Sequence, residues 1–292
     1  MLNLAIIDAD SLSYLGSKDD TLQQILEKVD NKIHEILVET KADYYVLLVS
    51  KGKYFRHEIS KSKDAPEGSY KSNRTYTTQP WVKTIKEYLI VKYKAVWYPN
   101  LEADDIAAWL MNQKLYLNTL ISGKEIIDNY IPDSSQLQSS EEVNKILVAK
   151  DKDLLYSIPG KHLNFSKKLG PEEWGMEWVE TSEADAANFV KSQMIIGDVS
   201  DGISGLYRKG EAYWKKISVE VVPSWGEILQ LYIVDYGESK GIFEFQKNYR
   251  LLHMLSTDED MLREVGYIPQ LPNFQKVSFE TSAEKLDDDL QF

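Results

Sequence analysis

The chain has 292 residues, of which 43% are hydrophobic, enough for one large domain or two modest ones. Its 46 acidic residues outnumber its 34 basic residues, and the net charge of −12, taken alone, argues against nucleic-acid binding, for which a basic footprint is expected. There is no Cys, which excludes disulfides and thiolate metal sites, and no apolar run is long enough to span a bilayer. We expect a soluble, cytoplasmic protein without a signal peptide.

Short apolar runs at Leu4–Ile7, Tyr44–Val49, Ala95–Tyr98 and Ile146–Ala149 predict four buried β-strands. Apolar residues between Leu22 and Leu37 recur at helical spacing, and residues 104–115 predict a second helix. Strands that alternate with helices in this way are typical of a parallel sheet with helices on its faces. The sequence therefore predicts the α/β class, with functional groups at the carboxyl ends of the strands.

The remaining segments predict a second, helical part and three polar stretches. Helices are expected at 183–196, 209–218, 224–236 and 244–255. Segment 51–78 is basic, with seven Lys or Arg against three acidic residues up to position 74, and is either a loop or a helix ordered by its ligand. Segment 118–144 predicts an exposed insertion, and the chain after Pro272 predicts a mobile acidic tail. The expected division is a core of residues 1–182, a helical subdomain of 183–270 and a tail of 271–292.

Acidic residues follow the predicted strands and open the predicted helices in four groups. On its own, each group has a plainer explanation as a helix cap or a solvated turn. Together they predict a divalent-cation site, because carboxylates that converge at strand ends repel one another unless cations lie between them. Oxygen ligands without His or Cys favour Mg²⁺ or Mn²⁺. The groups are Asp8 with Asp10, Glu102 with Asp104 and Asp105, Asp151 with Asp153, and Asp198 with Asp201.

The order and spacing of five motifs resemble the flap-endonuclease superfamily, most of all the bacteriophage and bacterial 5′-nucleases, including phage RNase H-like enzymes. The motifs are IIDAD, SYKSNR, LEADDIAAW, AKDKDLL and IIGDVSDGISG, and the similarity covers roughly residues 3 to 255. This resemblance implies a PIN-like α/β nuclease core with a helix-hairpin DNA-binding subdomain. It also implies 5′-3′ exonuclease or flap endonuclease activity on DNA or RNA primers by a two-metal mechanism.

The resemblance implies roles for particular residues. Asp8, Glu102 and Asp104 would surround one Mg²⁺ or Mn²⁺ ion, and Asp151, Asp153, Asp198 and Asp201 the second, with Asp105 supporting either site. Lys71 and Arg74 would act in catalysis from a helical arch over the metals, where Tyr70 would stack on a base. The helix-hairpin would bind the duplex and a monovalent cation, through Gly205, Arg208, Lys209 and Gly210.

Departures from the family pattern occur at three places. Ser50 stands where the family usually has a metal-site Asp, so Asp10 or water would have to substitute. The hairpin reads GLYRKGEAYW, which favours a duplex grip by the charges of Arg208 and Lys209 over a glycine-rich amide cradle. The insertion at 118–144 carries no chemical motif.

The expected partners are DNA with a 5′ flap, nick or overhang and an RNA–DNA hybrid. The ending LDDDLQF resembles acidic tails that recruit partners, so a single-strand-binding or other replication protein is a further candidate beside a simple solvated tail. We expect no membrane partner and a monomer.

Two other functions stay open at the sequence level. A haloacid-dehalogenase-type phosphatase would also use an early DxD and a later GDxxD, but it gives no reason for LEADD or SYKSNR. A DNA-binding protein with weakened catalysis is the second, because Ser50 removes one metal ligand.

Overall fold

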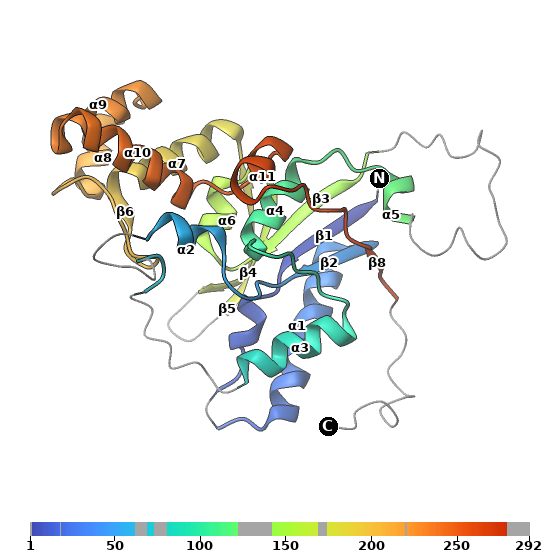
Figure 1. Ribbon diagram of the computed structural model, residues 1–292. Helices are drawn as coiled ribbons and strands as arrows, with labels where there is room; N and C mark the ends of the chain where they lie inside the picture. Colours follow the sequence, from blue (N-terminus) through green and yellow to red (C-terminus); the bar gives the residue numbers. More distant parts are fainter. Residues whose placement is uncertain are drawn as a thin grey trace.

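The computed structural model describes residues 2–17, 19–61, 69–72, 81–121, 142–168, 174–219 and 221–278. Its centre is a six-stranded sheet with the order β5-β4-β3-β1-β2-β8 (Figure 1). The four inner strands are parallel: β1 (Asn3–Asp8), β2 (Tyr44–Leu48), β3 (Asn144–Ala149) and β4 (Gly160–Lys168). Both edge strands, β5 (Trp174–Thr181) and β8 (Gln275–Lys276), are antiparallel to their neighbours.

Both faces of the sheet are covered by helices, so neighbouring residues of β1 are buried in opposite cores. Ala5 and Ile7 pack in the core under α1 (Leu22–Thr40) and α3 (Val82–Lys92). Leu4 and Ile6 pack in the other core, beneath α4 (Ala103–Asn112), α6 (Lys152–Ser157) and α11 (Asp258–Val265). Residues Leu4 to Ile7 of β1 are apolar and buried, so the first carboxylate of the strand stands where it ends, at Asp8.

A helical subdomain lies beside the carboxyl ends of the parallel strands (Figure 1). It is built from α7 (Glu183–Ile196), the two-residue strands β6 (Gly197–Asp198) and β7 (Ile203–Ser204), α8 (Glu211–Ile217), α9 (Trp225–Tyr236) and α10 (Glu238–Leu252). Its apolar core centres on Met194, Ile228 and Tyr232, and Tyr70 from the basic segment joins it. Short helices complete the described chain: η1 (Ser11–Tyr14), α2 (Phe55–Ile59) and α5 (Leu117–Ile121).

The α/β class with a helical subdomain is confirmed, but two expectations about elements are wrong. Ala95–Tyr98 is no strand: Val96 makes one bridge to Leu48, and Pro99, which lacks an N–H, follows closely. The chain after Pro272 does not begin a free tail, because β8 pairs with β2 and Phe274 is buried in the core. The sequence patterns also missed the β4–β5 hairpin and α11. Most of the insertion, residues 122–141, and the last residues, 279–292, lie outside the described part.

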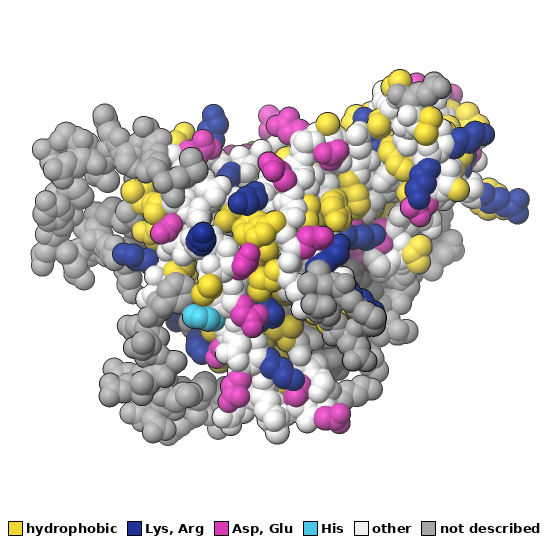
Figure 2. All heavy atoms as spheres, turned by 180° about the vertical axis from the view of Figure 1, so that it is seen from behind, with side chains coloured by type: hydrophobic (Ala, Val, Ile, Leu, Met, Phe, Trp, Pro, Cys, Tyr) yellow, Lys and Arg dark blue, Asp and Glu magenta, His cyan; other side chains and the backbone are white. Residues whose placement is uncertain are grey.

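Surface charge is mixed on the face opposite to the view of Figure 1, where acidic and basic side chains alternate (Figure 2). Basic side chains gather at the outer end of the helical subdomain in that view. Among the described residues, no helix combines the length and apolar character needed to cross a membrane.

Candidate active site

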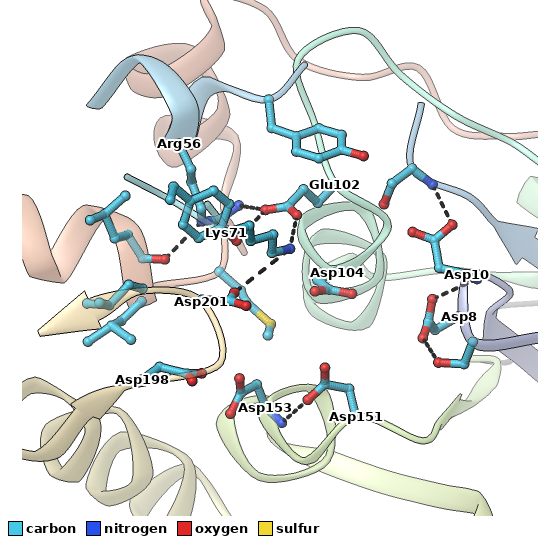
Figure 3. Close-up of a pocket in the computed structure, with 18 of the residues that line it drawn as sticks. Asp8, Asp10, Arg56, Lys71, Glu102, Asp104, Asp151, Asp153, Asp198 and Asp201 are labelled. Atoms are coloured by element: carbon cyan, nitrogen blue, oxygen red, sulfur yellow. Dashed lines mark hydrogen bonds and ion pairs between the residues drawn. The ribbon is translucent and has the colours of Figure 1, made fainter. Parts of the chain in front are cut away.

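Acids from four separate parts of the chain line one pocket at the carboxyl ends of the parallel strands (Figure 3). Each is placed by the element that ends or begins there. Asp8 ends β1, Glu102 is the N-cap of α4, Asp151 is the N-cap of α6 and Asp198 ends β6. The pocket therefore brings together seven of the predicted metal ligands and Asp10: Asp8, Asp10, Glu102, Asp104, Asp151, Asp153, Asp198 and Asp201.

The electrostatics of this pocket fit a divalent cation. Burial, and then the charge of Asp10, raises the pKa of Asp8 to about 7. Burial, followed by the charges of Asp151 and Asp198, raises the pKa of Asp153 to about 7, and burial with Asp8 raises the pKa of Asp104. Within the described ranges, no three acidic or His side chains converge into a closed ligand set. The donors are all hard oxygens, so the residues fit Mg²⁺ or Mn²⁺ once the carboxylates draw together.

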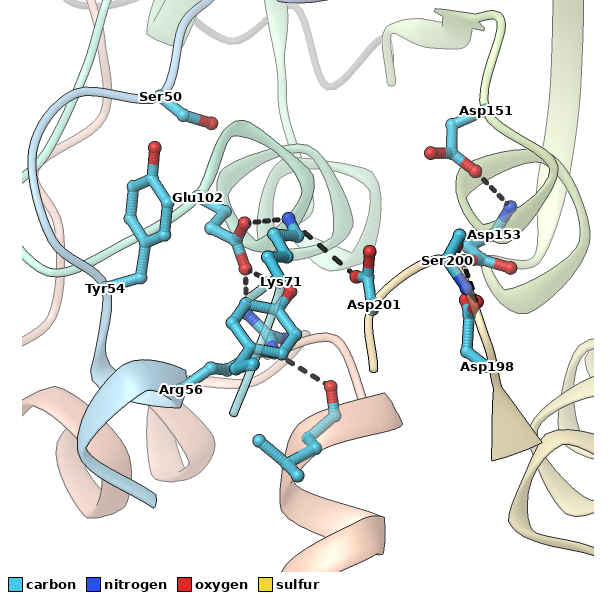
Figure 4. A network of polar contacts seen from close by, with 12 residues as sticks. Ser50, Tyr54, Arg56, Lys71, Glu102, Asp151, Asp153, Asp198, Ser200 and Asp201 are labelled. Atoms are coloured by element: carbon cyan, nitrogen blue, oxygen red, sulfur yellow. Dashed lines mark hydrogen bonds and ion pairs between the residues drawn. The ribbon is translucent and has the colours of Figure 1, made fainter. Parts of the chain in front are cut away.

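Arg56 is the centre of a buried network behind the pocket (Figure 4). Its guanidinium binds both oxygens of Asp105 at 2.6 and 2.7 Å and donates to Glu102 at 3.1 Å. It also donates to the carbonyl oxygens of Leu251 and His253, at 3.0 and 2.9 Å. Arg56 thus ties α2, α4 and the end of α10 together, and it orients Glu102 toward the pocket.

Asp105, which was predicted to support either metal site, lies behind the pocket and apart from the other predicted ligands. Asp105 is fully buried, is not part of the pocket wall, and uses both carboxylate oxygens on Arg56. One of these oxygens also accepts from the backbone N–H of Leu255 at 3.1 Å. Asp105 lies in the first turn of α4, where it binds the Arg56 guanidinium, and this guanidinium in turn positions Glu102.

Lys71 lies at the wall of the pocket, where its ammonium group forms an ion pair with Glu102 and lies 3.8 Å from Asp201 (Figure 4). Its backbone N–H donates to the Asp201 carbonyl at 2.8 Å, so the segment 69–72 is attached to the β6–β7 turn. Burial lowers the pKa of Lys71, but Glu102 and Asp201 outweigh this and raise it. Lys71 and Arg56 together hold the pKa of Glu102 below its usual value in spite of burial.

The two neighbours of Lys71 that the sequence singled out have different outcomes. Tyr70 is 5% exposed and donates its hydroxyl to Glu102 at 2.8 Å, so it supports the site and is not a surface for base stacking. The described part of the expected arch around Lys71 is a turn rather than a helix. Arg74 lies outside the described residues.

Ser50 takes up a structural role at the place of the expected carboxylate. Its hydroxyl oxygen accepts from the N–H of Ala103 at 2.9 Å, where α4 begins, and its own N–H donates to Asp10 at 2.9 Å. Lys86, from α3, donates to the Ser50 carbonyl at 3.0 Å and lies 2.7 Å from Asp10. A lysine charge therefore sits beside Asp10, the acid that the sequence offered as a substitute ligand.

The predicted helix-hairpin residues divide into packed and exposed positions. A Cβ at Gly205 would collide with the backbone of Ile195 and Gly197, so this glycine permits close packing of β7 against the end of α7. Lys209 forms an ion pair with Asp235. Arg208 is exposed, and Gly210 is the N-cap of α8 with open space around it. Of the two basic residues, Arg208 is the one whose charge faces solvent.

Sequence patterns missed three residues of this site. Arg56 is one of seven basic residues between positions 51 and 74, and no motif distinguishes it from the others. Lys86 and Gln193 lie within helices and carry no motif, yet Lys86 pairs with Asp10 and Gln193 donates to Asp153 at 2.7 Å. Only the three-dimensional arrangement identifies these two.

The fold of the chain is shared with solved structures, although its sequence matches no protein-family model. No curated protein matches it either.

Solved structures from bacteriophage T5 share this fold at low sequence identity. The T5 D15 protein co-crystallized with metal ions superimposes with a TM-score of 0.55 and 18% identity, over 87% of this chain and 90% of that one. The T5 D15 flap endonuclease in a pseudo-enzyme-product complex with DNA and metal ions gives 0.53 and 17%, over 87% and 89%. The T5 5′-exonuclease with bound zinc gives 0.53 and 19%, over 87% and 90%. The resemblance seen in the motifs is thus confirmed at the level of the fold.

Proposed function

We propose that the chain is a structure-specific 5′-nuclease, with 5′-3′ exonuclease and flap endonuclease activity, that hydrolyses phosphodiesters of DNA or of RNA primers on DNA. The convergence of acids from β1, α4, α6 and the β6–β7 turn on one pocket, with Lys71 at its wall, carries this proposal. The T5 structures with metal ions and with DNA support it through the shared fold. Primer removal in replication or repair is the role that goes with this activity.

The proposed cofactors are two divalent ions, Mg²⁺ or Mn²⁺. Asp8, Glu102 and Asp104 would hold one of them, and the second would be held by Asp151, Asp153, Asp198 and Asp201. Such ions, when bound, activate water and stabilise the attacking and leaving oxygens of an in-line displacement. The hydrogen bonds from Ser11 to Asp8 and from Ser200 to Asp198, at 3.0 and 2.6 Å, fix carboxylate oxygens at opposite ends of the pocket.

Lys71 is the residue that we expect to contact the scissile phosphate. Its ammonium group already lies between Glu102 and Asp201, and a phosphate oxygen would compete for it once cations bind those carboxylates. In that position Lys71 neutralises charge that grows on the phosphate during the reaction. Arg56 keeps Glu102 in place while Lys71 moves, because it has its own hydrogen bond to that carboxylate.

A cleavage assay tests the proposal directly. Labelled 5′-flap, nicked and RNA–DNA substrates are incubated with Mg²⁺ or Mn²⁺ and with Asp151→Asn, Lys71→Ala and the control Asp19→Asn, an exposed acid outside the pocket. We expect Asp151→Asn to abolish cutting, Lys71→Ala to slow it by about 10²- to 10³-fold, and Asp19→Asn to match the wild type. Unchanged cutting by Asp151→Asn would remove the catalytic assignment.

A DNA-binding protein with weakened catalysis is the second candidate, and the surroundings of Ser50 favour it. The hydroxyl of Ser50 caps α4 and the nearby Asp10 pairs with Lys86, so this corner of the pocket offers less negative charge to an ion. Binding of flap DNA without cleavage at millimolar Mg²⁺ or Mn²⁺ would favour this candidate. A phosphatase of the haloacid-dehalogenase type predicts that Lys71→Ala keeps full activity on a small phosphorylated substrate.

A further inference from the structure

A second pocket lies against the acidic one and shares part of its wall. It has a volume of about 490 Å³ and lies between the end of β2 and α3. Ser50, Tyr54 and Lys86 line both pockets, so the two cavities adjoin at these residues. The proposed hydrolysis in the acidic pocket does not use this second pocket.

The charge of the second pocket is opposite to that of the first. Lys51, Lys83 and Lys86 line it, against a single acid, Glu87. Lys86 is fixed at the junction by Asp10 and the Ser50 carbonyl, at 2.7 and 3.0 Å. Lys51 and Lys83 are exposed at the rim, where Lys51 lies over the Trp97 ring at 4.9 Å and Lys83 lies 3.9 Å from Glu87. Both ammonium groups remain accessible to a ligand's negative charge.

The rest of the lining is apolar or aromatic. Val49, Val82 and Ile90 form the apolar wall, and the ring of Tyr54 stands beside Ser50 at the junction (Figure 4). An apolar wall with a positively charged rim is complementary to one nucleotide, which has a flat apolar base and an anionic phosphate. A polyanion that reaches the acidic pocket is repelled there, and the lysines next to it offset that repulsion.

We propose that the second pocket binds one nucleotide of the unpaired strand that adjoins the bond to be cut. Lys51 and Lys83 contact its phosphates, and the wall at Val82 takes its base. This subsite rests on the proposed nuclease function, since it supposes that a nucleic-acid strand reaches the acidic pocket. It adds a specificity determinant: substrates with an unpaired nucleotide gain contacts that a fully paired nick does not make.

Binding measurements with two DNA substrates test the subsite. Lys51→Gln and Lys83→Gln are compared with Lys94→Gln, an exposed lysine just past α3 and outside both pockets. Each substitution is combined with Asp151→Asn so that the DNA is not cut. Fluorescence anisotropy then gives Kd for a 5′-flap and for a nicked duplex over a range of salt concentrations. For the flap, each pocket variant lowers the slope of log K against log salt by about 0.7, the value of one single-strand phosphate contact. The slope for the nick stays as in the parent.

A variant that fills the cavity tests the base contact without changing charge. Val82→Phe, with its fold checked by circular dichroism, weakens flap binding by about tenfold and leaves nick binding unchanged. Equal losses on both substrates, or no loss on either, overturn the subsite. A flap-specific loss of binding in the Asp151→Asn background, combined with no cutting of either substrate by the protein that keeps Asp151, leaves the subsite standing and removes the nuclease function instead. Normal cutting by the protein that keeps Asp151, without any flap-specific loss of binding in the pocket variants, overturns the subsite and leaves the nuclease function standing.

Discussion

The two sides of the acidic pocket differ in how the negative charge of their buried carboxylates is compensated. On the cation-paired side, which consists of Arg56, Lys71, Glu102 and Asp105, each buried carboxylate has a basic partner from the chain itself. On the anion-rich side, the acids Asp8, Asp104, Asp151, Asp153 and Asp198 lie near one another (Figure 3). Among the described residues, these acids accept hydrogen bonds mostly from neutral donors, such as Ser200, Ser11 and Gln193, and Lys152 lies 3.9 Å from Asp153.

The two sides therefore contribute differently to the stability of the fold and to the binding of a cation. On the cation-paired side, burial would raise the pKa of Glu102, yet Lys71 and Arg56 lower it, so its charge is already compensated. On the anion-rich side, burial and like charges raise the pKa of both Asp8 and Asp153 to about 7. The first arrangement stabilises the fold, whereas the second destabilises it and is relieved by a bound cation.

The largest effect is expected from Arg56→Met. Removal of this cation leaves Asp105 and Glu102 buried without their shared partner and leaves two backbone carbonyls without a donor. We expect the free energy of unfolding in urea to fall by about 3–5 kcal/mol. Arg250→Met removes a half-exposed arginine from Glu264, which keeps Arg263 as a partner, and should cost about 1 kcal/mol or less. If both variants lose a similar amount of unfolding free energy, the cation-paired side contributes no more to stability than a surface ion pair does.

A smaller effect of the opposite sign is expected from Asp153→Asn. In EDTA at pH 8 this variant should be more stable than the wild type, because it removes one of the mutually repelling charges on the anion-rich side. Mg²⁺ should stabilise the wild type by about 2.7 kcal/mol at a hundredfold excess over its Kd, and the variant much less. Thermal unfolding with and without Mg²⁺ measures both. The exposed control Asp19→Asn should respond to Mg²⁺ like the wild type, and equal responses by all three proteins would refute the contrast.

The sequence predicted the parallel core because its strands are short, apolar and buried on both faces. The β4–β5 hairpin was missed because its strands lack this apolar pattern. The four consecutive buried residues of β4 include His162 and Asn164, which are polar. His162 fits there because its ring nitrogen bonds the Ile158 carbonyl at 2.8 Å. Strand β5 lies at the edge of the sheet and exposes Trp174, so it lacks the apolar signal of the inner strands.

The pocket acids could be predicted because parallel strands and helix N-termini bring their ends to one place in any fold of this class. Their partners could not. Arg56 is 49 residues from Asp105 and 195 from Leu251, and Lys86 is 36 from Ser50. Such pairings depend on how helices pack over the sheet, which local patterns do not encode. Asp105 shows the consequence, because position in the sequence grouped it with ligands while packing turned it toward Arg56.

The smallest effect concerns the pH dependence of the cation-paired side. The backbone carbonyl of His253 accepts a hydrogen bond from the Arg56 guanidinium, and the His253 ring stacks on Tyr249 at 4.9 Å between ring centroids. Burial lowers its pKa, and Arg56 lowers it further, although Asp260 at 3.4 Å and Asp105 act in the opposite direction. The unfolded chain therefore binds a proton at His253 before the folded protein does as the pH falls, so this residue makes stability decrease below about pH 6.5.

His253→Gln should make the free energy of unfolding less dependent on pH between 7.5 and 5, as measured by urea titrations at several pH values. The exposed His34→Gln should leave the wild-type dependence in place. The effect is small because Asp260 offsets part of the burial that lowers the pKa of His253. If His253→Gln keeps the wild-type slope, the acid sensitivity arises elsewhere, and the neutral ring beside Arg56 plays no part in it.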